Sequence, residues 1–110
     1  MPTELNLNIS NARGGFRIFG LAYFTSKNSI NPKLIFKENE FEYKCIFSSI
    51  ASYNEIKKVD IRKGISNFLV LDINQFVFAA EILTNSKIKD AITYLHNKGC
   101  PLTEEAKKYI

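Results

Sequence analysis

The chain has 110 residues, of which 45% are hydrophobic and 24% are charged. These proportions are those of ordinary globular proteins, so they exclude wholesale disorder, and the length fits one domain over residues 1–110 that buries its core without metal or disulfide support. The net charge of +4 comes from 15 basic residues spread among 11 acidic ones, a distribution that argues against a nucleic-acid-binding surface.

Targeting signals, membrane spans and metal sites are not expected from the sequence. The N-terminal stretch "MPTELNLNIS" has no basic leader followed by an apolar segment, and no apolar run reaches the about 18 residues that a membrane span needs. Cys45 and Cys100 lie far apart, and with the single His96 they form no metal-ligand set. We therefore expect a cytoplasmic protein without a cofactor, with peripheral attachment to a membrane as the alternative.

The first third of the chain has two β-like segments. In "LNLNI" (residues 5–9) the apolar residues alternate with asparagines, which is the period of a strand with one buried face. "FRIFGLAYF" (residues 16–24) is a second β-rich run, and the preceding "ARGG" permits a turn or a bulge. The polar stretches 10–15, 25–31 and 48–55 are expected to be loops.

Two hairpins and a connecting strand follow. "LIFKENEFEYKCIF" (residues 34–47) alternates with period two on either side of the polar reversal "ENE". "KVDIRK" (residues 58–63) predicts another strand, with Ile56, Val59 and Ile61 in the core. Residues 68–83 form the second hairpin, which turns at Asn74 and Gln75 and is apolar on both faces. About seven strands in all indicate a sandwich or a partly open barrel.

The period changes to that of a helix after Leu83. Apolar residues recur at helical spacing in "SKIKDAITYLHNKG", which predicts a helix over about 86–98, capped by Ser86 or Asn85 and ended by Gly99. Its apolar stripe must be buried against the sheets. A short helical turn over about 103–110 is expected to begin at Thr103 as N-cap.

Strands in this number followed by one C-terminal helix are the order found in pleckstrin-homology-like (PH-like) domains. The segment "LIFKENEFEYKCIFSSIASYNEIKKVDIRKG" resembles the middle of the bacterial PH family, where a hairpin "I-x-F-x-x-x-x-F-x-Y" leads through a loop to "x-E-I-x-x-V-x-I". The pattern is carried by Phe36, Phe41, Tyr43, Tyr53, Glu55, Ile56, Val59 and Ile61. The resemblance covers residues 33–99 and implies a mainly β, PH-like barrel or sandwich of about seven antiparallel strands capped by one C-terminal α-helix.

The resemblance implies a binding or assembly role without fixing the ligand, because PH-like domains bind phosphoinositides, peptides or proteins. Lipid-binding members carry a cluster of basic residues on the first strands, and here Arg17 has no arginine two places on. The loop in "NARGGFRIF" could hold an anion through glycine N–H groups and Arg13, or it could be a glycine bulge that only shapes the backbone.

We expect a non-enzymatic module that mediates protein–protein association, since the runs 16–24 and 67–73 carry more apolar surface than one helix can cover. The alternative is peripheral binding to anionic lipid or to a phosphate-bearing ligand. Its candidate residues are Arg13, Arg17, Lys57, Lys58, Arg62 and Lys63. No catalytic residue is expected, because His96 has no nearby nucleophile in a recognisable motif, and the aromatic residues alternate as core residues rather than as a nucleic-acid stacking platform.

Overall fold

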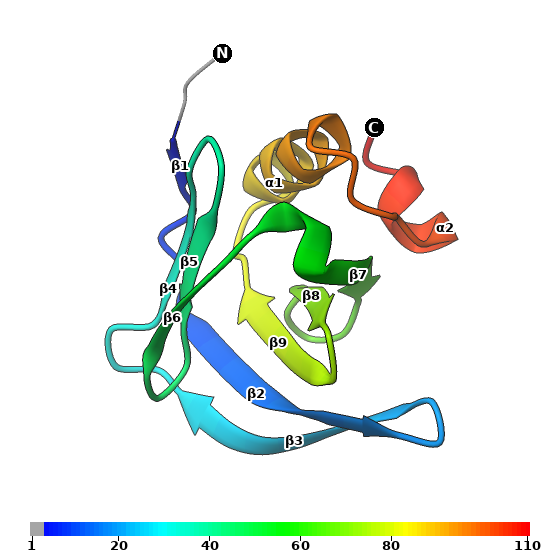
Figure 1. Cartoon of the computed structure of the whole chain (residues 1–110). Helices are drawn as coiled ribbons and strands as arrows, with labels where there is room; N and C mark the ends of the chain where they lie inside the picture. The colour runs from blue at the N-terminus through cyan, green and yellow to red at the C-terminus, as the bar shows by residue number, and fades with distance from the viewer. Residues whose placement is uncertain (1–3) are drawn as a thin grey trace.

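The computed structural model describes residues 4–110 and arranges the strands in two antiparallel β-sheets (Figure 1). The four-stranded sheet has the order β1-β4-β5-β6, and the five-stranded sheet has the order β3-β2-β9-β8-β7. The strands of the first sheet are β1 (Leu5–Asn6), β4 (Lys33–Phe36), β5 (Phe41–Lys44) and β6 (Ser48–Ala51). Those of the second are β2 (Asn11–Ile18), β3 (Leu21–Asn28), β7 (Ile56–Arg62), β8 (Phe68–Ile73) and β9 (Phe76–Glu81). A 3₁₀ turn, η1 (Tyr53–Glu55), precedes β7, and two helices follow, α1 (Asn85–Asn97) and α2 (Glu104–Lys107).

The mainly β fold with C-terminal helices is confirmed, but the sheets do not close into a barrel. β3 and β7 are the two edges of the five-stranded sheet. The described residues form nine strands instead of about seven, because the run 16–24 is divided by a turn at Phe19 and Gly20 into parts of β2 and β3, and because one expected loop forms a strand of its own. In all, three expected loops contribute strand residues. Asn11–Gly15 lie in β2, Thr25–Asn28 in β3 and Ser48–Ala51 is β6. The stretch in β2 pairs with β3 and β9, the stretch in β3 pairs with β2, and β6 pairs with β5. Backbone pairing therefore overrides the weak β propensity of these polar residues.

The main core lies between the two sheets and α1. It includes Ile56, Val59 and Ile61, as predicted from the sequence. The apolar stripe of α1 is also buried, and the Tyr94 ring stacks on Phe36 of β4 with 5.4 Å between centroids. The Tyr94 hydroxyl donates to the Lys37 carbonyl over 2.9 Å, which ties the helix to the end of β4.

β8 is buried on both faces, as a strand with apolar residues on both sides should be. On the face away from α1, a second cluster contains Phe68, Val70, Val77 and Ala79, with Ala22 and Phe24 of β3 packed against it. The expectation that the run 67–73 would leave apolar surface uncovered is therefore wrong for β8. The cover comes from neighbouring side chains of the same curved sheet, which local sequence does not reveal.

The predicted α1 is confirmed with a shifted start. Its N-cap is Thr84, whose side chain accepts from the Lys87 N–H, in place of the expected Ser86 or Asn85. The extended backbone of Thr84 leaves its hydroxyl free to cap the first turn. At the other end Gly99 has a positive φ of 84°, and the Cys100 N–H donates back to the Leu95 carbonyl over 3.1 Å. This is the terminator that a glycine in the left-handed region provides.

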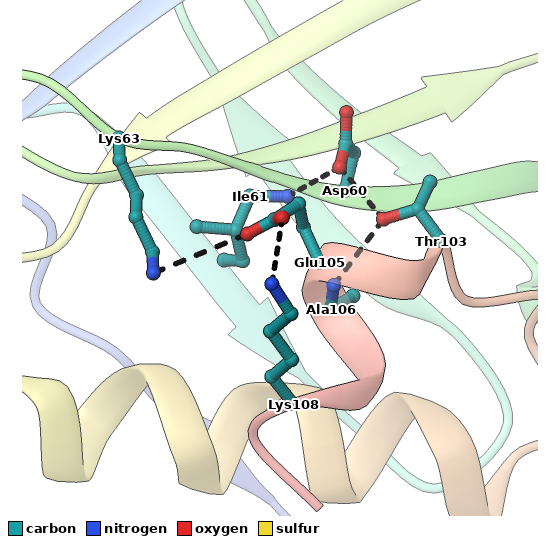
Figure 2. Close-up of polar contacts among 7 residues, drawn as sticks. All are labelled: Asp60, Ile61, Lys63, Thr103, Glu105, Ala106 and Lys108. Carbon is teal, nitrogen blue, oxygen red and sulfur yellow. Dashed lines mark hydrogen bonds and ion pairs between the residues drawn. The ribbon is translucent and has the colours of Figure 1, made fainter.

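The segment before α2 covers the outer edge of β7. The Val59 N–H donates to the Pro101 carbonyl over 2.8 Å, and the Thr103 N–H donates to the Val59 carbonyl over 2.9 Å. Figure 2 shows the Thr103 hydroxyl between Asp60 of β7, to which it donates over 2.7 Å, and the Ala106 N–H, from which it accepts. Thr103 is thus the N-cap of α2, as predicted, and also attaches α2 to the sheet.

Candidate functional site

Two of the six predicted basic residues meet on the face of the five-stranded sheet that lies away from α1. Arg13 lies on β2 opposite Ala79 of β9. Arg62 lies at the end of β7 opposite Phe68 of β8. β9 and β8 lie between them, so the sheet order brings together residues from opposite halves of the chain.

Arg13 and Arg62 line a pocket of about 260 Å³, which we call the arginine pocket. Its apolar walls come from Phe24, Phe68, Ile65 and Ala79. The loop between β7 and β8 forms its rim. The lining residues are Arg13, Phe24, Arg62, Lys63, Gly64, Ile65, Ser66, Phe68, Ala79 and Glu81.

Aromatic rings hold both guanidinium groups. The Arg13 guanidinium lies 4.7 Å from the centroid of the Phe68 ring, and that of Arg62 lies 5.8 Å from the centroid of Phe24. A guanidinium held over a ring face is restricted by the ring, while its N–H groups remain available as donors in the guanidinium plane. Within residues 4–110 no hydrogen bond or ion pair satisfies the Arg13 Nε, which is buried.

Glu81 introduces one negative charge into the same pocket. Its carboxylate accepts from the Ser10 hydroxyl over 2.6 Å. The hydrogen bonds from Ser10 and then Ser66 lower the pKa of Glu81 below its ordinary value, and Arg13 and Lys27 add a favourable field. Glu81 is therefore ionised at neutral pH and is held by two serine hydroxyls.

Lys63 lines the arginine pocket, but its ammonium group has partners on the C-terminal segment. It lies 4.0 Å from a Glu105 carboxylate oxygen and 6.0 Å from the centroid of the Tyr109 ring. Figure 2 shows Glu105 between Lys63 and Lys108, whose ammonium lies 3.0 Å from the other Glu105 oxygen. The charge of Lys63 is therefore partly compensated from α2.

The other three predicted residues do not line the arginine pocket. Arg17 forms a two-point ion pair with Asp72 of β8, with contacts of 2.5 and 3.1 Å, and also donates to the Gly20 carbonyl. The hydrogen bond that Arg17 donates to Asp72 raises the pKa of Arg17. Lys57 is exposed on β7, and Lys58 lies opposite Asp72. The six residues thus do not form one continuous basic surface.

A second candidate site is the apolar surface of the β2–β3 hairpin. Five large apolar side chains of the predicted run 16–24 are exposed there: Phe16, Ile18, Phe19, Leu21 and Tyr23. Leu21 retains 61% of its accessible surface, and Phe19 in the turn retains 100%. We call this set the hairpin surface.

The hairpin surface adjoins an apolar depression between the two sheets. Phe16 pairs with Tyr23 on one side and with Phe76 on the other. Phe76 lines a pocket of about 340 Å³ together with Tyr43, Phe47 and Ile46, and the last two are themselves exposed. Exposed apolar side chains thus gather around one side of the β2–β3 hairpin and the adjoining depression.

The chemistry-bearing residues outside these two surfaces are scattered. Cys45 and Cys100 are free and buried, and burial raises the pKa of the Cys100 thiol to about 11. His96 is exposed on α1. In the part of the chain that the structure describes, no three His, Cys, Asp or Glu residues gather as metal ligands. No helix among these residues is long and apolar enough to cross a bilayer.

Sequence reasoning found the arginines of the pocket but missed its walls. The sequence indicates Phe24 and Phe68 only as members of the apolar runs 16–24 and 67–73, and it does not single out Ser66 or Glu81. Only the sheet order places them beside Arg13 and Arg62, and that order depends on the pairing of β2 with β9. The irregularity expected at "ARGG" is present as a register shift between Gly14 and Gly15, but the residue without a partner is Thr25 of β3, since β2 pairs with β9 without interruption.

Comparison of the chain with protein-family models, curated proteins and solved structures finds no match. The resemblance to the bacterial PH family therefore stays a prediction.

Proposed function

We propose that the chain is a non-enzymatic binding or assembly module that associates with a second copy of itself through β3 and the hairpin surface. The observation that carries this proposal is the exposure of five large apolar side chains on one hairpin. Exposed apolar clusters of this kind are unfavourable in water and are typically covered by a protein partner.

The contrast between the two edges of the five-stranded sheet supports strand addition at β3. The β7 edge is blocked at Val59, whose N–H donates to the Pro101 carbonyl and whose carbonyl accepts from the Thr103 N–H. Among residues 4–110, no strand pairs with the outer edge of β3. An uncovered edge strand is a template for another strand, and two antiparallel copies of β3 would extend the sheet across the dimer.

The composition of β3 favours a second copy as the occupant. Lys27 is its single charged residue and lies near its C-terminal end. In an antiparallel pair of β3 strands centred near Tyr23 and Phe24, the two Lys27 side chains lie at opposite ends and do not repel each other. The interface would be self-complementary, as a two-fold symmetric contact requires.

We retain a PH-like fold as part of the proposal. Its support is the order of strands followed by a C-terminal helix, together with the residues that carry the resemblance. A broad basic surface for anionic lipid is less favoured, because Arg17 is paired with Asp72 and Lys63 lies beside Glu105.

The proposal is tested by sedimentation velocity of the whole chain over a wide concentration range. We expect a concentration-dependent dimer that is weakened at least about tenfold in Leu21→Asn/Tyr23→Thr, since each residue contributes exposed apolar surface. Leu83→Asn is the matched control, because Leu83 is also exposed but lies just before α1, outside the hairpin surface. A chain that stays monomeric at its highest concentration, or a dimer unchanged by the hairpin variant, would contradict the proposal.

A further inference from the structure

We propose that the arginine pocket binds one small organic oxyanion, a carboxylate or a phosphate monoester carried on an apolar body. This site lies on the sheet face away from α1 and does not depend on the hairpin surface. It therefore adds a small-molecule function to the proposed association.

The two guanidinium groups of the arginine pocket have no hydrogen-bonding or ionic partner among the described residues. Across residues 4–110 neither Arg13 nor Arg62 makes a side-chain hydrogen bond or ion pair, whereas Arg17 on the same strand as Arg13 is fully engaged by Asp72 and Gly20. A buried donor without an acceptor carries a desolvation cost, which the Arg13 Nε incurs. An oxyanion is the acceptor that matches the fork of N–H groups on an arginine.

The rim of the pocket offers further donors. In the described part of the chain, the backbone N–H groups of Gly64, Ile65 and Ser66 donate to no protein acceptor. A methyl group added at Gly64 would meet only the Ser66 carbonyl oxygen, at 3.6 Å, so the loop is uncrowded at this residue. Successive free N–H groups beside an arginine form a common kind of anion-binding concavity.

The walls of the pocket define the rest of the ligand. Phe24, Phe68 and Ala79 are apolar, and Phe24 and Phe68 also support the guanidinium groups. A ligand body that is apolar or aromatic would contact these walls while its charged end reaches the arginines. A bare inorganic ion would leave the walls uncovered.

Glu81 limits the charge that the pocket accepts. Its carboxylate lines the same pocket and is held by Ser10 and Ser66, so it would repel a second negative group. Two arginines against one carboxylate leave an excess of one positive charge at the pocket, to which the compensated Lys63 adds little. This balance favours a ligand with a single charged end.

The test is a titration of the whole ¹⁵N-labelled chain at low salt with phenylacetate and with phenyl phosphate, followed by NMR. We expect saturable shifts at the amides of Gly64, Ile65 and Ser66, and none with benzyl alcohol, which has the ring without the charge. Arg13→Gln and Arg62→Gln should each weaken binding at least about tenfold, since charge-assisted hydrogen bonds are lost. Lys57→Gln removes the same charge from an exposed position on β7 and should leave binding unchanged.

A vesicle arm distinguishes a free anion from a lipid headgroup. Co-sedimentation with anionic vesicles that is lost in Arg62→Gln would support the arginine pocket with a lipid headgroup as the source of the oxyanion. Vesicle binding that persists in both arginine variants, with soluble-probe shifts that those variants also leave unchanged, would overturn the proposal by placing anion recognition elsewhere. The absence of saturable shifts with both soluble probes, together with no vesicle binding, would overturn it as well.

Discussion

Arg13 and Arg17 are two residues of one type on one strand and one sheet face, yet they have different roles. Arg17 meets the only carboxylate of β8, Asp72, which is itself buried, and the pair joins β2 to β8 across β9. Arg13 is four residues earlier, opposite Ala79 of β9, and its guanidinium forms no ion pair with Glu81 further along that strand, although the two charges attract each other. In the sequence Arg13 and Arg17 are equivalent cations. Their roles differ because their neighbours across the sheet differ.

We predict that Arg17→Gln lowers the free energy of unfolding by about 1–3 kcal/mol, because it leaves the Asp72 carboxylate buried without its ionic partner. Arg17 is partly exposed, so the loss should fall below that for a fully buried ion pair. The double variant Arg17→Gln/Asp72→Asn should recover part of the loss, and Lys57→Gln should be neutral. Denaturant unfolding of the wild type and these three variants measures the losses, and equal losses in Arg17→Gln and Lys57→Gln would contradict the assignment.

Tyr53 provides a prediction about pH. Burial raises the pKa of Tyr53 well above its ordinary value, and its hydroxyl donates to the Lys37 and Glu40 carbonyls. The unfolded chain therefore loses this proton at lower pH than the folded chain. The stability that depends on it is complete below about pH 10, the ordinary tyrosine pKa, and is lost as pH rises further.

We expect the wild-type free energy of unfolding to fall above about pH 10 more steeply than that of Tyr53→Phe, by up to about 1.4 kcal/mol per pH unit for one proton. Below about pH 9 the two curves should run parallel, separated by the cost of the lost hydrogen bonds. Unfolding followed by circular dichroism across this range gives both slopes. Identical slopes would show that Tyr53 ionises equally readily in the folded and unfolded states.

At the scale of elements, the β2–β3 hairpin depends on one glycine. The register between the strands shifts between Gly14 and Gly15, and a methyl group at Gly15 would lie 1.8 Å from the Tyr23 carbonyl oxygen. No side-chain movement relieves a clash with backbone, so any residue but glycine must displace β3. The hairpin surface is thus oriented by a bulge that the sequence shows only as "GG".

We predict that Gly15→Ala destabilises the chain by about 1–3 kcal/mol or more, as overpacking against fixed atoms does. It should also change the NMR shifts of β3 amides. Gly64→Ala is the matched control, because its added methyl group meets nothing closer than 3.6 Å and its backbone is not in the left-handed region. If the two variants were equally stable, the close approach of β2 and β3 at the bulge would be wrong.

The elements that could be predicted from the sequence are those whose signal is local. The β8–β9 hairpin with its turn at Asn74 and the helix α1 follow from periodicity and turn residues. β6 and the first half of β2 could not be predicted, because their polar residues become strands only through pairing with β5, β9 and β3. The two arginines of the arginine pocket could be predicted as candidate binding residues from the sequence alone. The residues that form its walls could not, because long-range strand order decides which side chains lie beside the arginines.

For the whole molecule, the strand order makes β8 and β9 the most protected part of the fold. β8 lies between β7 and β9, and all six of its residues are buried, whereas β1 has two residues and pairs with β4 alone. Because β9 also pairs with β2, opening this sheet disrupts contacts between the two ends of the chain. The free energy of local opening should therefore be small at β1, whereas opening at β8 should require global unfolding.

We predict that the amides of Val70 and Leu71 exchange with solvent only at the rate of global unfolding, and that the amide of Asn6 exchanges many times faster.

The amides of β3 report on the proposed association. In the monomer the outer edge of β3 is open, so amide exchange in β3 should slow as the protein concentration rises. Amide exchange in β8 should change little. Exchange followed by NMR at two concentrations measures both. Uniform protection across β1, β3 and β8 would mean that the sheets open as one unit, which contradicts the hierarchy argued from strand order.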